Sequence, residues 1–299
     1  MKKVVVIGLG NVGMAYVNDL INTNLADEIV LIDLDRDKIL GEAMDLSHAA
    51  TVFNSNINIK AGDYKDCFNA DLVVITAGLN QEKGETRLNL INRNDEIIKS
   101  IVKEVMQSGF DGIFLVATNP VDIMTYSVRK YSGLPHNKVI GTGTLLDTER
   151  LKYLLSKKIH VSTENIHAYV LGEHGDSSFV VWSKSTIGMV PILDTVSKED
   201  LDAIEYETKH LGYKIIDYKN ETSYGVAMCM IKITKAIFKD ENVVLNVSSP
   251  VDGIYISMPS VINKTGIKGT MKIDFNEEES IKFENTKNII KDAIKSMEG

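Results

Sequence analysis

A glycine-rich turn near the start of the chain restricts its fold more than any other feature. It spans residues 8–13, Gly-Leu-Gly-Asn-Val-Gly, and directly follows the apolar run of residues 4–7. Glycines at this spacing allow a tight turn, a close approach of the backbone to a pyrophosphate and close packing of a helix on the strand. The turn therefore predicts a βαβ unit that binds a dinucleotide, rather than a glycine-rich turn without a ligand. The residues expected at the cofactor are Gly8, Gly10, Asn11, Val12 and Gly13.

A carboxylate follows where such a unit needs one. Asp33 comes directly after the second apolar run, Glu28–Ile32, and lies 20 residues beyond Gly13. A carboxylate at this place accepts hydrogen bonds from a ribose diol and repels a 2′-phosphate. The predicted cofactor is therefore NAD rather than NADP.

Short β-branched runs alternate with helix-like segments over the first half of the chain. This order predicts right-handed crossovers on a parallel sheet. We expect an α/β fold, with a Rossmann doubly wound parallel sheet in an NAD-binding domain over residues 1–141. The strands expected there are Lys3–Ile7, Glu28–Ile32, 72–76, 112–117 and 139–140, and the helices are 15–21, 38–46 and 96–106.

The second half has a different pattern, which predicts an α+β substrate domain over residues 142–299. Long amphipathic segments predict helices, and a β-rich stretch near the end predicts an antiparallel meander. No linker separates the halves, so we expect them to pack closely. The expected helices are 147–156, 199–217, 225–238 and 277–295, and the expected strands are 166–171, 188–191 and a meander over 244–273.

The bulk composition excludes several classes of protein. Lysine and arginine number 33 and aspartate and glutamate 41, so the net charge of −8 argues against a nucleic-acid or anionic-membrane partner. No apolar run approaches the roughly 20 residues of a spanning helix, and the run that ends before Gly8 is too short for an export signal. Cys67 and Cys229 have neither metal-ligand nor redox spacing, so we expect a reduced, cytoplasmic chain without a metal.

A histidine in a glycine-flanked loop is the first candidate for acid–base chemistry. His174 follows the apolar segment 166–171 within the stretch Gly-Glu-His-Gly. Asp147 could orient its ring, and the pair would then exchange protons with a substrate. Arg150 lies three residues after Asp147, so both point to one side of a helix, where the planar guanidinium could hold a substrate carboxylate. A structural histidine and an ordinary surface ion pair are the alternatives.

A polar loop follows the third expected strand, at the edge where parallel sheets bind ligands. Thr76, Ala77 and Gly78 end that strand and are expected to contact the cofactor. The loop over residues 80–87 that comes next contains a glycine and ends in Arg87. It could close over a substrate as a lid, or it could be only a solvated connection.

Taken together, these segments resemble the L-lactate/malate dehydrogenase family, in particular its bacterial L-lactate and L-2-hydroxyisocaproate dehydrogenase members. The resemblance covers essentially the whole chain, in the order expected of the family. It rests on residues 8–13, Asp33, 80–87, Thr-Asn-Pro-Val-Asp at 118–122, 140–147, Gly-Glu-His-Gly at 172–175 and Thr-Ser-Tyr-Gly at 222–225.

The resemblance implies a role for each matching position. His174 would be the acid–base residue that protonates a 2-oxo group, with Asp147 holding its imidazole. Arg150 would bind the substrate carboxylate, and Arg87 would polarise the reacting carbonyl. Asn119 would help to place substrate and nicotinamide before a cis peptide bond to Pro120, and Thr222 would line the substrate pocket.

The resemblance also bears on the substrate, a small 2-oxo or 2-hydroxy acid. Gln81 stands where malate dehydrogenases of the family carry arginine, and an unpaired second carboxylate there would cost on the order of 3–5 kcal/mol. L-lactate is therefore the preferred prediction and malate the less favoured one. Gly212, where lactate enzymes commonly have alanine, favours a longer side chain, as in an L-2-hydroxyisocaproate dehydrogenase.

Assembly and regulation follow from the same resemblance. A homo-oligomer, tetramer or dimer, is expected, and many bacterial relatives are activated by fructose 1,6-bisphosphate. His167 matches the effector histidine, whereas Lys152 replaces the expected arginine. Two other hypotheses share only the first domain: a non-catalytic nucleotide-sensing module, and an NAD-dependent glycosidase. Neither explains why Asp147, Arg150 and His174 occur together.

Overall fold

The computed structural model describes residues 1–52, 55–80 and 86–298 of the chain. Its centre is a nine-stranded sheet in the order β14-β13-β12-β6-β5-β4-β1-β2-β3. The six strands from β3 to β6 are parallel, in the doubly wound order 3-2-1-4-5-6. The predicted fold class is confirmed. These strands are β1 (Lys3–Ile7), β2 (Glu28–Ile32), β3 (Asn58–Ala61), β4 (Leu72–Ile75), β5 (Ile113–Val116) and β6 (Val139–Gly141).

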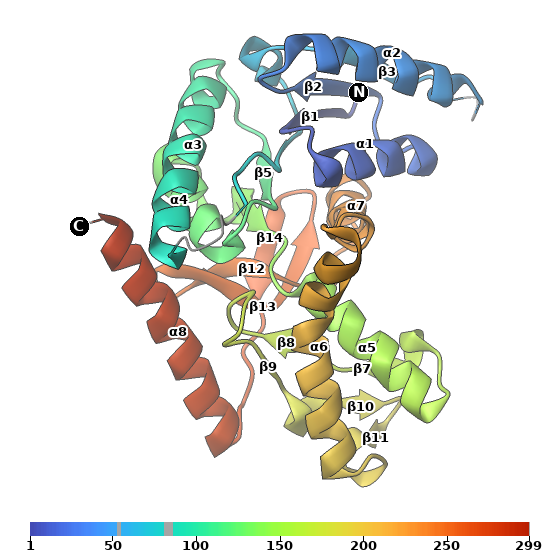
Figure 1. The fold of residues 1–299 in the computed structure, drawn as a ribbon, viewed down its shortest axis with the longest axis vertical. Helices are drawn as coiled ribbons and strands as arrows, with labels where there is room; N and C mark the ends of the chain where they lie inside the picture. The colour runs from blue at the N-terminus through green and yellow to red at the C-terminus, as the bar shows by residue number, and fades with distance from the viewer. Residues whose placement is uncertain (53–54, 81–85, 299) are drawn as a thin grey trace.

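Helices cover both faces of this sheet, which is why the inner parallel strands β1, β2, β4 and β5 are almost entirely apolar. Along β1, Val4 and Val6 pack on one face, and Val5 and Ile7 on the other. The first face carries α1 (Asn11–Thr23), α2 (Arg36–Val52) and α7 (Tyr224–Phe238). The second carries α3 (Arg87–Gln107), α4 (Val121–Ser132) and α8 (Glu277–Glu298), as Figure 1 shows.

The second half of the chain extends the same sheet. Ser248 bridges Gly141 of β6, so an antiparallel meander continues the parallel strands without a gap. A third apolar cluster joins two helices to small antiparallel sheets in the lower part of Figure 1. The elements are α5 (Leu145–Ile159), α6 (Lys198–Lys219), β7 (Ile166–His167), β8 (Val170–Leu171), β9 (Phe179–Val180), β10 (Thr186–Ile187), β11 (Val190–Pro191), β12 (Val243–Val251), β13 (Ile254–Asn263) and β14 (Gly266–Thr270).

The sequence did not predict β3, α4 or the two-residue strands β9 and β10. β3 is a four-residue edge strand in which only Ile59 is buried, so it lacks an alternating pattern. α4 is buried over most of its first two turns, including its polar residues Asp122, Thr125 and Ser127. These polar side chains are buried together with the apolar ones, so burial in this part of the helix does not follow the polarity of the sequence.

Some segments are also shorter or more irregular than expected. The expected strand over 166–171 divides into β7 and β8, and short 3-10 helices join several elements. They span Tyr64–Cys67, His136–Lys138, Thr163–Asn165, Trp182–Lys184 and Ile192–Asp194. Among the described residues, every helix is too short or too polar to cross a membrane.

The glycine turn yields a prediction about stability. An alanine Cβ at Gly13 would lie 2.2 Å from the carbonyl oxygen of Gly8 and 2.9 Å from the Thr76 hydroxyl. Gly13→Ala should therefore lower the free energy of unfolding by about 1–3 kcal/mol, measured by urea denaturation. Gly41→Ala, in α2 with open space around its Cβ, is the control and should be neutral or stabilising. Equal stabilities of the two variants would contradict close packing at the turn.

Candidate active site

The glycine turn has the shape that a dinucleotide phosphate needs. Gly8 has a φ of +96°, and a Cβ there would overlap the backbone of Ala77. Gly10 caps α1 without a side-chain hydrogen bond, and the position where its Cβ would stand has no atom within 4 Å. The first backbone N–H groups of α1, at Asn11 and Val12, therefore lie next to a residue without a side chain, which leaves room for an anion.

Asp33 lies beside this turn. Its Oδ2 accepts the backbone N–H of Leu9 at 2.6 Å, and Lys38 Nζ donates to the Leu9 carbonyl at 2.8 Å. Both backbone polar groups of Leu9 are thus held by side chains that follow β2. The carboxylate is partly exposed at the end of its strand, so the residues present fit a bound NAD.

The strand ends of β4 and β5 meet the same turn. Thr76 donates its hydroxyl to the Gly8 carbonyl at 2.5 Å, and Ala77 N–H donates to Ile7. A Cβ at Gly78 would lie 2.4 Å from Thr118, so this loop also packs too closely for a side chain. The structure therefore gathers the residues predicted at the cofactor along one edge of the sheet.

Asn94 joins the two strand-end loops. It is fully buried in α3, its Oδ1 accepts the Leu79 N–H at 2.8 Å, and its Nδ2 donates to the Asn119 carbonyl at 2.8 Å. The Asn119–Pro120 peptide bond is cis, as expected, and Asn119 itself is exposed. Asn94 had no predicted role. The signal available was a polar residue on the apolar face of the helix that carries Ile91 and Ile98.

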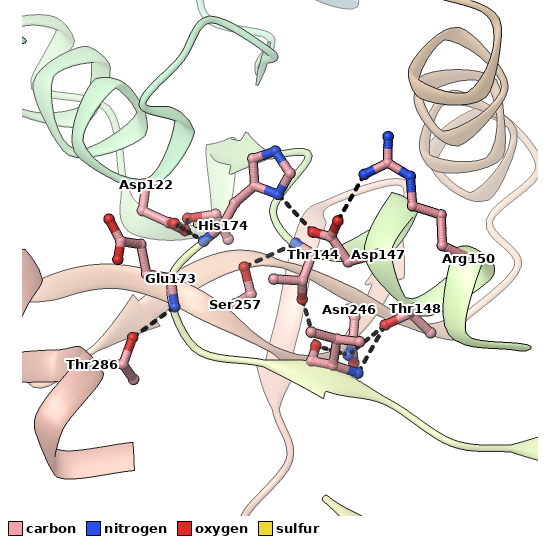
Figure 2. A network of polar contacts seen from close by, with 12 residues as sticks. Asp122, Thr144, Asp147, Thr148, Arg150, Glu173, His174, Asn246, Ser257 and Thr286 are labelled. Carbon is pink, nitrogen blue, oxygen red and sulfur yellow. Dashed lines mark hydrogen bonds and ion pairs between the residues drawn. The ribbon is translucent and has the colours of Figure 1, made fainter. Parts of the chain in front are cut away.

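The three predicted charged residues form one chain of contacts (Figure 2). His174 Nδ1 lies 2.6 Å from Asp147 Oδ2, and Arg150 Nη1 donates to Asp147 Oδ1 at 3.0 Å. The side chains of Asp147 and Arg150 are 12% and 14% exposed, and that of His174 is 28% exposed. Nε2 of His174 and Nη2 of Arg150 point to the same side of Asp147. One molecule on that side could contact both groups.

Buried hydrogen bonds bring together the segments that carry Asp147 and His174. Thr144, at the start of α5, donates its hydroxyl to the Val170 carbonyl at 2.5 Å, and the Thr148 hydroxyl accepts the Val170 N–H at 3.1 Å. Asn246 of β12 donates to the same carbonyl at 2.7 Å. Because β8 is tied to α5 in this way, the loop after β8 brings His174 to Asp147 although 27 residues separate them.

The pKa values of His174 and Asp147 shift in opposite directions. Burial lowers the pKa of His174, but the charge and hydrogen bond of Asp147 outweigh it, so the pKa lies above the ordinary histidine value. Burial raises the pKa of Asp147, yet His174 and Arg150 together hold it below the ordinary value. The imidazolium and the carboxylate therefore stabilise each other, and the ring holds its proton to a higher pH than an ordinary histidine does.

The remaining predicted residues lie at different distances from this centre. Gly212, on α6, faces Arg150, because an ideal Cβ there would lie 3.4 Å from Nη1. Thr222 lies in the half-buried connection between α6 and α7. Gln81 lies outside the described residues, and so does the side chain of Arg87, the first residue of α3.

The two residues predicted to bind an effector, Lys152 and His167, lie in the middle of α5 and on β7. Lys152 Nζ stands 5.6 Å from the ring centroid of Tyr169, and burial lowers the pKa of this lysine. His167 is exposed and pairs with Thr186 across the small sheet. Neither residue contacts His174, Asp147 or Arg150.

Comparisons with known proteins agree with this geometry. The NAD binding domain of the lactate/malate dehydrogenases matches residues 2–141, and their alpha/beta C-terminal domain matches residues 144–299. An L-lactate dehydrogenase of Geobacillus sp. is 47% identical over 98% of this chain and 96% of its own length. One from Staphylococcus saprophyticus is 49% identical over 97% and 95%.

Solved structures are similar over the whole chain. A lactate dehydrogenase from a Medee basin deep-sea metagenome library superposes with a TM-score of 0.97 at 47% identity, covering 100% of this chain and 99% of that one. The ligand-bound minor L-lactate dehydrogenase of Enterococcus mundtii gives a TM-score of 0.95 at 40% identity, covering 99% and 98%. The chain belongs to the lactate/malate dehydrogenase family. The predicted NAD-dependent oxidoreductase, with NAD as cofactor, is confirmed with that membership.

The His174–Asp147 contact yields a prediction about protonation. Asp147→Asn removes the charge that stabilises the imidazolium, so the pKa of His174 should fall by about 1–3 units. NMR titration of the histidine ring protons, assigned with a His174→Asn variant, measures this shift. Asp176→Asn, which removes an exposed carboxylate from the same loop, is the control. An unchanged His174 titration in Asp147→Asn would show that the contact does not set the pKa.

Proposed function

We propose that this chain is an L-lactate dehydrogenase, which reduces pyruvate to L-lactate with NADH and catalyses the reverse reaction. The observation that carries the proposal is the chain of contacts from His174 through Asp147 to Arg150, in a protein with an NAD-binding domain. Relatives with 45–49% identity over nearly the whole chain bear that name. The non-catalytic sensing module and the NAD-dependent glycosidase leave this chain of contacts unexplained.

His174 and Asp147 perform the proton transfer. Nδ1 of the ring is held by Asp147, so Nε2 is the atom that gives its proton to the 2-oxo oxygen. The ring is cationic before the proton transfer and neutral after it. In both states it is hydrogen-bonded to the Asp147 carboxylate. NADH, when bound at the glycine turn, supplies the hydride that reaches the carbonyl carbon.

Two arginines are proposed to bind the anionic parts of the substrate. The planar fork of Arg150 suits a substrate carboxylate, and its Nη2 points to the same side as Nε2 of His174. Arg87, at the first position of α3, is proposed to stabilise the negative charge that develops on the oxygen. Asn119 is proposed to orient substrate and nicotinamide from the end of β5. The low exposure of Asp147 and Arg150 strengthens such contacts.

The proposed function and the second candidate differ in the substrate side chain that the pocket accepts. Gln81 offers no charge to a second carboxylate, which favours pyruvate over oxaloacetate. Gly212 leaves the space next to Arg150 without a side chain, and this observation favours an L-2-hydroxyisocaproate dehydrogenase as the second candidate. Thr222 is proposed to line the same pocket wall.

Several wider features belong to the proposal. We propose an NAD-binding domain over residues 1–141, with Asp33 binding the adenine ribose, and a substrate domain over residues 142–299. The protein would act in the cytoplasm as a homo-oligomer, a tetramer or a dimer. Lys152 and His167 are the proposed contacts for fructose 1,6-bisphosphate, and the partly buried position of Lys152 argues for weak activation.

The loss of the acid–base residue tests the reaction. His174→Asn should keep NADH affinity but lose roughly 10²–10⁴-fold in turnover of pyruvate, because an amide cannot deliver the proton. NADH absorbance measures turnover and NADH fluorescence measures binding. His160→Asn is the matched control, since His160 is exposed and has a left-handed φ of 56° that asparagine tolerates. More than about a tenth of wild-type turnover in His174→Asn would reject the assignment.

A charge at position 81 tests the substrate. Gln81→Arg should raise kcat/KM for oxaloacetate by at least about 10²-fold and lower it for pyruvate, because the guanidinium pairs only with a second carboxylate. Gln107→Arg adds the same charge at the exposed far end of α3 and should change neither value. A wild-type panel from pyruvate to 2-oxoisocaproate distinguishes the two candidate functions. Equal effects of Gln81→Arg on both substrates would place specificity in the wall near Gly212 instead.

A further inference from the structure

Asp122 is a buried carboxylate that the proposed reaction does not use. It lies in the first turn of α4, three residues after Asn119, and is 2% exposed. A buried ionised group is costly unless hydrogen bonds and nearby charges stabilise it. Asparagine would have the same shape without that cost, so the presence of a charge at this position calls for an explanation.

The contacts of Asp122 lead to both partners of the catalytic pair. Oδ2 accepts the backbone N–H of His174 at 2.7 Å, and Oδ1 accepts the Ser248 hydroxyl at 2.6 Å (Figure 2). The Ser257 hydroxyl also bonds to this carboxylate, and its oxygen accepts the Thr144 N–H at 3.0 Å.

Thr144 is the residue before α5, the helix that carries Asp147 three positions later. One carboxylate therefore holds the main chain of His174 directly and the start of the Asp147 helix through a single buried serine. Ser248 and Ser257 are both fully buried, on β12 and β13. Asp122 and Thr144 are likewise buried, so water cannot easily replace the bonds among these four residues.

We infer that Asp122 is a positioning residue that holds His174 and Asp147 in register and adds negative charge beside the imidazolium. Its place on α4, directly after the Asn119–Pro120 turn, also joins this pair to the cofactor side of the site. The inference rests on the proposed function, since it assigns Asp122 a part in the same proton transfer.

The charges around His174 support the second part of this inference. Asp147 contacts the ring of His174, Asp122 accepts the backbone N–H of His174, and Arg150 contacts the other oxygen of Asp147. Burial lowers the pKa of His174, whereas both carboxylates raise it and Arg150 lowers it. Burial raises the pKa of Asp122 itself, and the bonds from Ser248, His174 and Ser257 oppose that effect. Four groups of alternating sign thus share one poorly solvated region, where each charge is felt strongly.

Two substitutions separate geometry from charge. Asp122→Asn keeps an oxygen that can accept the His174 N–H but removes the charge. The falling limb of the pH profile of pyruvate reduction should then move to lower pH by about 0.5–1 unit, with kcat on the low-pH plateau within about threefold of wild type. Asp122→Ala removes the acceptor as well, so kcat on that plateau should fall by about tenfold or more while the Kd of NADH changes less than about twofold.

A second pair of variants tests the link to α5 without changing a buried charge. Ser257→Ala removes the bond that holds Thr144 and should lower kcat about three- to tenfold, with NADH affinity unchanged. Ser260→Ala is the matched control on the same strand, because Ser260 is equally buried and bonds to Met258 and Thr270 instead. Its kcat should equal that of wild type. Equal kcat values for these two variants would overturn the positioning role.

Direct titration of His174 keeps this test distinct from that of the proposed function. In Asp122→Asn, the NMR pKa of His174 should fall by the same 0.5–1 unit, whichever 2-oxo acid the enzyme prefers. A His174 pKa and pH profile that stay at their wild-type positions would overturn the inference even if pyruvate is the substrate. Conversely, a wild-type enzyme inactive on every 2-oxo acid would reject the proposed function. The His174 titration would then still test whether Asp122 raises the pKa of His174.

Discussion

All six parallel strands of the central sheet point the same way, so the residues that follow them meet along one edge. The glycine turn after β1, Asp33 after β2, Thr76 after β4 and Asn119 after β5 come together there because the right-handed crossovers return the chain to the same side each time. The apolar strands supply the rigidity, and the polar residues at their ends supply the chemistry. Every other part of the proposed site is placed relative to this edge.

The second half of the chain reaches this edge through buried polar contacts as well as through apolar packing. β12 pairs with β6 at a single bridge, and the Asp122 network crosses the same region from α4 to β12 and to the loop that carries His174. Such hydrogen bonds are directional, and leaving one unmade in the interior costs about 1–3 kcal/mol. They therefore specify one relative placement of the catalytic groups, which apolar contacts would define less sharply.

The proposed proton donor, His174, depends on a balance of opposing effects on its pKa. Burial alone would favour a neutral imidazole, and the adjacent carboxylate reverses that preference. Arg150 contributes on both sides, since it stabilises Asp147 and slightly disfavours the imidazolium. A substrate carboxylate at Arg150 would reduce that unfavourable part, so substrate binding and protonation of His174 should support each other.

The sequence by itself determined the parallel sheet, the glycine turn, the carboxylate after β2 and the pairing of Asp147 with Arg150. Each depends on local period or spacing: strands of β-branched residues, glycines where a Cβ would overlap the backbone, and two side chains one helical turn apart. It did not indicate α4, whose first two turns bury polar as well as apolar side chains, and it assigned no role to Asn94 or Asp122. Their partners lie 15 to 126 residues away in the chain. Only the tertiary structure brings those partners within hydrogen-bond distance, because contacts between distant segments have no period or spacing that a sequence could display.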